Sequence, residues 1–213
     1  KLTKGYEKMR IIDLTHPLTN EIKEYPGDPK LEIKYFKKAD EKDSCTLFEF
    51  KSGLHTGTHM DAPYHYMING KKIKDFKIDS FIGTTTILKS DTHNEIKLKD
   101  LDNLNNIQDI VIINTGWCNN WNSNDYFYDY PHISSELAEF LIENNIKGIA
   151  IDTCSVDKHD ENKIHKMFLK NEIWIVENIA NLDKINKKEY NGYFIPLNIE
   201  AEASFVRAFL EEK

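Results

Sequence analysis

The segment HTGTHMDAPYH, residues 55–65, constrains this chain more than any other part of the sequence. It holds three of the eight histidines of the chain together with an aspartate. Gly57 lowers helix propensity, and Pro63 lacks a backbone donor and would break a helix. The segment is therefore expected to be extended, so its ligand-type side chains must gather for a reason other than helix formation.

An extended backbone sorts these side chains by face. Period two places His55, His59 and Asp61 on one face of a strand. A straight strand would separate the Cα atoms of His55 and His59 by roughly 13 Å, which is at the limit of what two imidazoles can span around one ion. We therefore expect the chain to bend at Gly57, and we expect the missing side chain of this glycine to leave room for an ion.

The side chains of this segment predict a metal site. Two imidazoles and a carboxylate are a ligand set for Zn²⁺ or Mn²⁺ that leaves a position open for water. A lone histidine in a turn more often only satisfies backbone groups, but the clustering of His55, His59 and Asp61 favours a metal site. His65 lies beyond Pro63, which redirects the chain. Its expected role is to carry a proton beside the metal rather than to be a fourth ligand.

Composition bounds the class of protein. The chain has 213 residues, of which 40% are hydrophobic and 30% charged, values that fit a globular protein with a real core. A net charge of −7 does not favour nucleic acid or a membrane surface as a partner. Apolar runs such as IVII at residues 110–113 are too short to span a bilayer. We therefore expect neither a nucleic-acid nor a membrane partner.

The N-terminus and the cysteines bear on location. The first ten residues lack the apolar core of a signal peptide. Residues 1–8 precede the first methionine, so we expect Met9 to be the native start and residues 1–8 to be an appended or disordered segment. The three cysteines are odd in number and form no C-x-x-C pair, which argues against a disulfide framework and for a cytoplasmic protein.

The remaining sequence predicts a single α/β domain over residues 1–213, with more strand than helix. Residues 134–148 are the clearest helix, capped by Ser134 or Ser135 and ended by Asn145 or Gly148. A second short helix is expected at 164–171, and residues 96–107 have a weak helical period. Strands are expected at the start of 9–18 and at 31–36, 45–50, 83–90, 107–116, 148–153, 172–178, 193–199 and 204–210, with 31–36 and 45–50 half-buried.

Residues 117–133, WCNNWNSNDYFYDYPHI, combine polar and aromatic side chains. The polar residues predict a surface loop or lid rather than a regular element. The aromatic residues are too many for a plain linker. Two roles stay open for them: covering an aromatic substrate, or forming an oligomer interface, where aromatic residues are enriched.

The signature at residues 55–65 resembles the H-x-G-T-H-x-D-A-P-x-H motif of the cyclase family, which includes bacterial kynurenine formamidases and isatin hydrolases. The resemblance extends over nearly the whole chain. Further matching segments are DLTHPLTNEIKEYPGDP (13–29), NTGW (114–117), DTCSVD (152–157), VEN (176–178) and ASFVRAF (203–209). It implies a swivelling β/β/α-type single domain, usually assembled as a homodimer or a larger oligomer such as a homotetramer.

The resemblance also implies a set of metal ligands. His55, His59 and Asp61 would bind one metal ion. His165 and Glu177 would complete a second site, with the carboxylates of Asp61 and Glu177 able to bridge. Three imidazoles and two carboxylates exceed a closed tetrahedral site, so we expect one or two Zn²⁺ or Mn²⁺ ions per chain.

The expected function is that of a metal-dependent hydrolase acting on a small amide, an N-formyl anilide or a cyclic imide or lactam. The resemblance makes His65 the acid/base and places Tyr25 where the formamidases carry a substrate-contacting tryptophan. The substrate would be a small aromatic or cyclic amide. Two other classes stay open: a hydrolase with Cys154 as nucleophile, near His159, and a binding protein that keeps the fold and metal without turnover.

Overall fold

The computed structural model describes residues 10–40, 44–187 and 189–213. The expectations for Met9 as native start and for residues 1–8 concern residues outside these ranges. Neither helix of the described part is long and apolar enough to cross a membrane.

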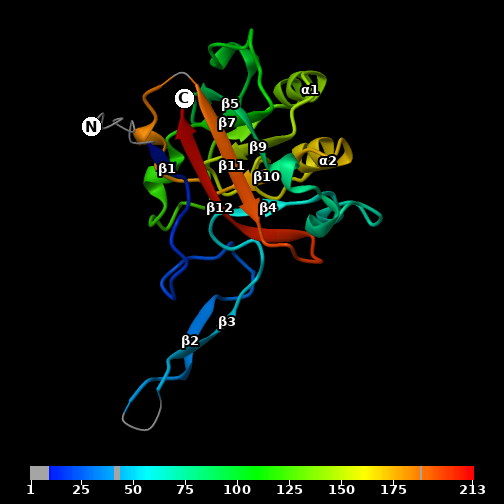
Figure 1. Ribbon diagram of the computed structural model, residues 1–213. Coiled ribbons are helices and arrows are strands. Elements are labelled where there is room, and N and C mark those ends of the chain that lie inside the picture. Colours follow the sequence, from blue (N-terminus) through cyan, green and yellow to red (C-terminus); the bar gives the residue numbers. More distant parts are fainter. Residues whose placement is uncertain (1–9, 41–43, 188) are drawn as a thin grey trace, which may run out of the picture.

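A closed ring of seven strands organises the chain (Figure 1). The ring closes because β4 pairs antiparallel with β10 along one edge and with β12 along the other. The strand-rich α/β fold expected from the sequence is confirmed. In ring order the strands are β12 (Ala203–Glu212), β11 (Tyr190–Pro196), β5 (Ile82–Lys89), β7 (Ile110–Asn114), β9 (Gly148–Ile151), β10 (Trp174–Glu177) and β4 (His59–Asp61), and β1 (Ile11–Asp13) pairs with β12 beside the ring.

The four strands β5, β7, β9 and β10 run parallel, and their apolar sequences reflect cover on both faces. Ile110 and Ile112 of β7 pack with Trp174 in a core cluster that also includes β11 and β12 residues. Val111 and Ile113 of the same strand belong to a second cluster, under the helices. Alternate side chains of one apolar run therefore fill two different cores.

Two helices, α1 (Ser135–Glu143) and α2 (Lys163–Lys170), lie side by side against this parallel half of the ring (Figure 1). The predicted cap of the first helix is confirmed, because Ser134 Oγ accepts a hydrogen bond from Leu137 N at 3.1 Å. The helix ends before Asn145, which adopts a left-handed φ of 55°. Gly148 instead begins β9.

The weak helical period at residues 96–107 does not produce an α-helix. Only a single 3-10 turn forms, at Leu98–Asp100. The carboxylate of Asp100 accepts the backbone N–H of Lys97 at 2.9 Å and closes that turn. Asn103 then adopts φ 64°, which stops helix propagation. β6 (Glu95–Ile96) lies at the start of this region and pairs parallel with β8 (His132–Ile133), at the end of the aromatic loop.

A hairpin of β2 (Glu32–Lys37) and β3 (Leu47–Lys51) projects away from the barrel (Figure 1). The expectation that these strands are half-buried is wrong: Tyr35 is 54% and Phe48 57% exposed. The alternation is present, but among the described residues most of the apolar face that it creates stays exposed, and Phe50 packs edge-on against Phe205 at a ring distance of 5.4 Å.

Close packing at one glycine of the ring generates a stability prediction. Gly148 lies opposite Trp174 in the β9–β10 ladder, and a Cβ at Gly148 would lie 2.1 Å from Trp174 ring atoms. We expect Gly148→Ala to lower the free energy of unfolding by about 1–3 kcal/mol, the usual cost of overpacking. In the control Gly53→Ala, the nearest atom is 3.3 Å away. Denaturant unfolding of both variants measures the difference, and equal stabilities would contradict the packing argument.

Candidate metal centre

The bend expected at Gly57 is present and carries the signature segment into the ring. Gly57 adopts φ 65°, a left-handed conformation open to glycine at low cost, and β4 begins two residues later. The expected room for an ion beside this glycine is absent. A Cβ on Gly57 would lie 2.8 Å from Leu18 Cδ2 and 3.1 Å from Ile22 Cδ1. Apolar packing, rather than space for an ion, requires glycine here.

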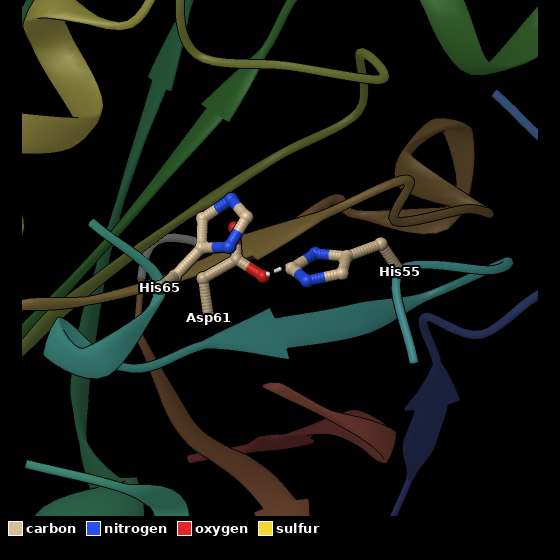
Figure 2. Close-up of side chains that lie close together, drawn as sticks. All are labelled: His55, Asp61 and His65. Carbon is tan, nitrogen blue, oxygen red and sulfur yellow. Dashed lines mark ion pairs between the residues drawn. The ribbon is translucent and has the colours of Figure 1, made fainter. Parts of the chain in front are cut away.

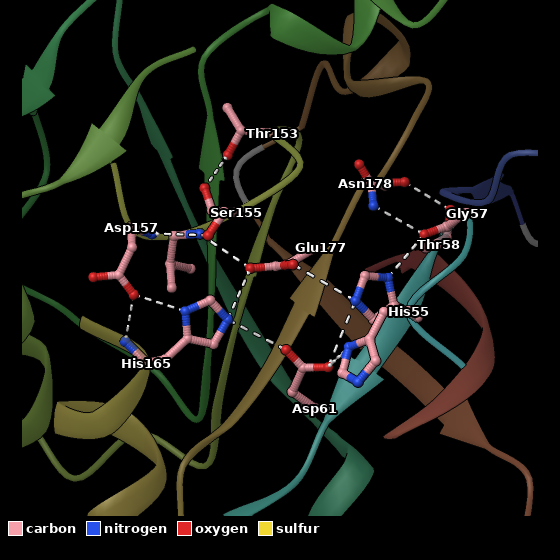
Figure 3. A network of polar contacts seen from close by, with 12 residues as sticks. His55, Gly57, Thr58, Asp61, Thr153, Ser155, Asp157, His165, Glu177 and Asn178 are labelled. Carbon is pink, nitrogen blue, oxygen red and sulfur yellow. Dashed lines mark hydrogen bonds and ion pairs between the residues drawn. The ribbon is translucent and has the colours of Figure 1, made fainter. Parts of the chain in front are cut away.

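Strand pairing brings distant parts of the chain to one point (Figure 3). His59 of β4 lies opposite Glu177 of β10 in the antiparallel ladder. Asp61 follows on the same face of β4, since side chains alternate along a strand. His165 comes from the first turn of α2. All four side chains are buried, so their polar atoms must satisfy one another or a bound group.

The two carboxylates lie between two imidazoles. His59 Nε2 is 3.5 Å from Asp61 Oδ1 and 3.5 Å from Glu177 Oε2. On the other side, His165 Nε2 is 3.3 Å from Asp61 Oδ2 and 3.2 Å from Glu177 Oε1. Each carboxylate thus presents one oxygen to each imidazole. This arrangement allows both carboxylates to bridge, as the resemblance implies.

The hydrogen bonds of His59 orient its ring for ligation. Its Nδ1 lies 2.9 Å from the carbonyl oxygen of Gly57, which can only accept, so Nδ1 carries the proton. The lone pair of the neutral ring is then on Nε2. Among the described residues, His59 Nε2 and both oxygens of Asp61 are buried without a hydrogen bond of sound geometry. A nitrogen lone pair and anionic oxygens that converge unpaired fit a bound cation.

His55 and His65 also lie beside Asp61 (Figure 2). His55 Nδ1 is 2.9 Å from Asp61 Oδ1, and the rings of His55 and His65 are 4.3 Å apart. Two groups of possible ligand atoms each lie within 4.8 Å: those of His55, Asp61 and His65, and those of His59, Asp61 and Glu177. The division differs from the expected one, which joined His55 with His59 and left His65 outside the ligands.

The charges of the cluster perturb one another strongly. Burial by itself would raise the pKa of Asp61, but the facing imidazoles of His55 and His59 lower it well below its usual value. Burial likewise opposes protonation of His55, yet the Asp61 carboxylate raises the pKa of His55 to about 10. The cause of both shifts is the close approach of buried carboxylate and imidazole groups, each of which favours the charged form of the other.

The cluster forms part of the lining of a cavity of about 340 Å³. Tyr25, the predicted substrate contact, lines this cavity and packs edge-on against Phe127 at a ring distance of 5.7 Å. Tyr66 and Tyr130 also line it. The site thus joins a polar cluster to aromatic walls.

The aromatic loop has polar residues on the surface, but several of its aromatic side chains, Tyr126, Phe127 and Tyr130, are buried. Tyr126 is wholly buried, and its hydroxyl donates to Asn178 Oδ1 at 2.9 Å. Trp121 stacks on His16 with ring centroids 3.8 Å apart. Lys23 Nζ donates to Asn122 O at 3.0 Å. The loop is therefore tied to the N-terminal segment, and the expectation that it lies on the surface is wrong for its buried aromatic residues.

The geometry does not favour Cys154 as a nucleophile. Burial and the negative charge of Glu177 raise the pKa of the thiol well above its usual value, which keeps it protonated. Its Sγ lies 4.0 Å from Tyr126 O. His159, its candidate base, instead stacks near Tyr128 and places Nδ1 3.1 Å from Asp160 Oδ2.

Three polar residues around the cluster had no role assigned from the sequence: Asp157, Asn178 and Glu202. Asn178 Nδ2 donates to Gly57 O at 3.0 Å, the carbonyl that also holds His59. Glu202 Oε1 lies 3.4 Å from His55 Nε2. The segments DTCSVD and VEN contain Asp157 and Asn178, but nothing in their spacing indicates which histidine or carbonyl each one reaches.

The strand ring closes into a barrel, and the buried histidine–carboxylate cluster lies next to aromatic side chains. These features define the class of protein: a barrel with a cluster suited to binding a cation. The family model described as "Putative cyclase" matches residues 12–158. The chain belongs to this cyclase family.

Similar proteins share nearly the full length of the chain. A kynurenine formamidase from Bacillus thuringiensis subsp. konkukian is 31% identical, covering 94% of this chain and 96% of the relative. One from Bacillus anthracis is 30% identical, with 93% and 96% covered. Among solved structures, isatin hydrolase A from Labrenzia aggregata, bound to benzyl benzoate, has a TM-score of 0.84 at 21% identity, covering 95% and 93% of the two chains. That structural likeness confirms the fold.

The central position of Asp61 generates a prediction about metal content. We expect Asp61→Asn to lose most bound metal, because the Asp61 carboxylate has one oxygen next to His59 Nε2 and the other next to His165 Nε2. Asp160→Asn is the matched control, since Asp160 also lines the cavity but lies outside the cluster. Elemental analysis of the purified variants measures the metal. Full metal content in Asp61→Asn would remove this residue from the site.

Proposed function

We propose that this chain is a metal-dependent hydrolase that cleaves a C–N bond in a small amide, an N-formyl anilide or a cyclic imide or lactam. One observation carries the proposal: Asp61 and Glu177 each offer one oxygen to His59 Nε2 and one to His165 Nε2. The cluster lines a cavity of about 340 Å³, a volume that suits a small molecule. The kynurenine formamidases among its relatives support this class.

The metal we propose is Zn²⁺ or Mn²⁺, with one or two ions per chain. Imidazole and carboxylate ligands suit both ions. His55, His59, Asp61, His165 and Glu177 would hold them. When bound, such an ion lowers the pKa of water toward neutrality and polarises a carbonyl group.

His65 is the proposed acid/base. Burial lowers its pKa to about 4, so its ring is neutral at neutral pH and can accept a proton. Its ring is 4.3 Å from that of His55 and 5.9 Å from that of His165, beside the proposed metal. His65 would take a proton from the attacking water and return it to the leaving nitrogen. An anilide or imide nitrogen needs less help to leave than an alkyl amide nitrogen.

Aromatic walls support an aromatic or cyclic substrate. Tyr25, Tyr66 and Tyr130 line the cavity together with the cluster, and flat side chains of this kind bury a ring with little loss of side-chain freedom. We propose Tyr25 as a substrate contact. Hydrolysis of a formanilide and of a cyclic imide, each measured before and after chelation, tests the proposed class. Activity that survives complete metal removal would contradict it.

The role of His65 generates a prediction. We expect His65→Ala to keep its metal and to lose roughly 10²- to 10⁴-fold in kcat, the usual contribution of a positioned acid/base. Metal content and kcat are measured on the same preparation. Loss of metal would instead make His65 a ligand, since its possible ligand atom lies within 4.8 Å of those of His55 and Asp61. An unchanged kcat would exclude His65 from the reaction.

We also propose that the chain forms a homodimer or homotetramer through the β2–β3 hairpin rather than through the aromatic loop. On one face of the hairpin Ile33 pairs with Phe50 and Tyr35 with Phe48. A two-stranded hairpin without cover is at best marginally stable in water. The charged pairs Glu32–Lys51 and Lys34–Glu49 lie on the opposite face of the hairpin. A second copy related by a two-fold axis would cover the same apolar face.

This assembly generates a further prediction. We expect the double variant Tyr35→Lys and Phe48→Lys to shift the sedimentation mass from an oligomer to the single chain. The control, Lys34→Ser with Glu49→Ser, alters the opposite face of the hairpin and is expected to leave the mass unchanged. A single-chain mass for the unaltered protein would exclude the oligomer.

The cysteines support a reducing, cytoplasmic location for the protein. Cys45, Cys118 and Cys154 are all unpaired.

A further inference from the structure

Asp157 is a buried carboxylate that contacts the proposed metal ligand His165 at the ring nitrogen facing away from Asp61 and Glu177 (Figure 3). Its Oδ2 lies 2.7 Å from His165 Nδ1 and accepts the backbone N–H of the same residue at 2.8 Å. Its Oδ1 accepts the backbone N–H of Ile164 at 2.6 Å. Two of these three contacts therefore reach one residue, His165.

The backbone contacts make Asp157 the cap of α2. The helix starts at Lys163, and Asn162, at the position before it, makes no side-chain cap hydrogen bond. The first N–H groups of a helix have no partner within the helix and need an acceptor. Asp157, which lies before the helix in the chain, supplies that acceptor. The same carboxylate therefore sets where the helix begins and how the His165 ring is turned.

The ring contact decides which nitrogen of His165 faces the cluster. An ionised carboxylate can only accept, so Nδ1 must carry a proton. Nε2 then points at Asp61 Oδ2, 3.3 Å away, and at Glu177 Oε1, 3.2 Å away. If Nε2 rather than Nδ1 carried the proton, an N–H group would point at the position where a cation has to bind.

The two central histidines are oriented by different means. His59 is held by a backbone carbonyl, that of Gly57, which no side-chain substitution removes. His165 is held by a side chain. We propose that Asp157 is a positioning residue that fixes the Nδ1-protonated form and the ring orientation of His165 for metal binding. This inference rests on the proposed metal site but not on any substrate.

Asp157→Asn keeps the size of the side chain and replaces one of its two acceptor oxygens by an NH₂ group, which can only donate. Asparagine is a good helix cap, and its amide oxygen retains the contact with Ile164 N when it takes the place of Oδ1. The NH₂ group then takes the place of Oδ2 and leaves both the Nδ1–H and the backbone N–H of His165 without this acceptor. We expect Zn²⁺ affinity, measured by competition with a chelator, to fall about 10- to 100-fold, the usual effect of removing the group behind a ligating histidine.

The matched control is Asp152→Asn. Asp152 is also wholly buried and accepts from Thr115 N at 3.0 Å, Thr115 Oγ1 at 2.7 Å and Cys118 N at 3.3 Å. Among the described residues, Asp152 makes no contact of this kind with an imidazole, so the Zn²⁺ affinity of Asp152→Asn is expected to match that of the unaltered protein. An equal loss of affinity in both variants would show a general effect of removing a buried charge and would overturn the proposal.

A second measurement does not depend on folding of the variant. The Nδ1–H of His165 in the unaltered protein is expected as a slowly exchanging proton in ¹H–¹⁵N spectra, both metal-free and with Zn²⁺. Absence of that signal, or attachment of Zn²⁺ at Nδ1, would overturn the role of Asp157. If the unaltered protein bound no Zn²⁺ but showed the protected Nδ1–H, the proposed function would fail while the orientation of His165 by Asp157 would stand.

Discussion

The convergence of two buried carboxylates on two imidazoles is the interaction on which the rest of this structure depends. Asp61 and Glu177 cannot both be buried as anions without compensation, because an unpaired buried charge is costly. Protonated His55, whose pKa the Asp61 carboxylate raises to about 10, supplies part of that compensation with its Nδ1 2.9 Å from Asp61 Oδ1. Both oxygens of Asp61 and Nε2 of His59 are buried without a hydrogen bond of sound geometry. A cation bound there would neutralise the negative charge that stays uncompensated. A metal would therefore stabilise the fold as well as provide chemistry.

The closed strand ring makes this convergence rigid. β4 is only three residues long, yet it is hydrogen-bonded on both edges, to β10 and to β12. A ligand strand held on both sides cannot shift its register without breaking two ladders. Cover then comes from loops, which tie Trp121 to His16 and Tyr126 to Asn178. The strands hold the proposed metal ligands in fixed positions, and the loops supply aromatic side chains that can adapt to a ligand. This arrangement suits the binding of a small molecule.

Local patterns in the sequence predicted several elements correctly. The apolar runs of β7 and β9 indicated buried strands, and Ser134 or Ser135 before an amphipathic stretch indicated a helix cap, which Ser134 provides. Local patterns were insufficient where contacts with other parts of the chain decide the outcome. The apolar alternation of the β2–β3 hairpin does not say whether another layer covers it. The period at residues 96–107 does not reveal the Asp100 turn and the left-handed Asn103 that end a helix before it starts.

The sequence by itself determined the ligand chemistry and the local bend: histidines and a carboxylate at alternate positions, with a glycine where the chain must turn. These are properties of neighbouring residues, which sequence spacing encodes directly. Only the tertiary structure decided that His59 faces Glu177, that His65 lies within reach of Asp61, and that Asp157 holds His165. Those pairings join residues from separate strands, turns and a helix. Their distances follow from strand register and helix placement, which no spacing along the chain specifies.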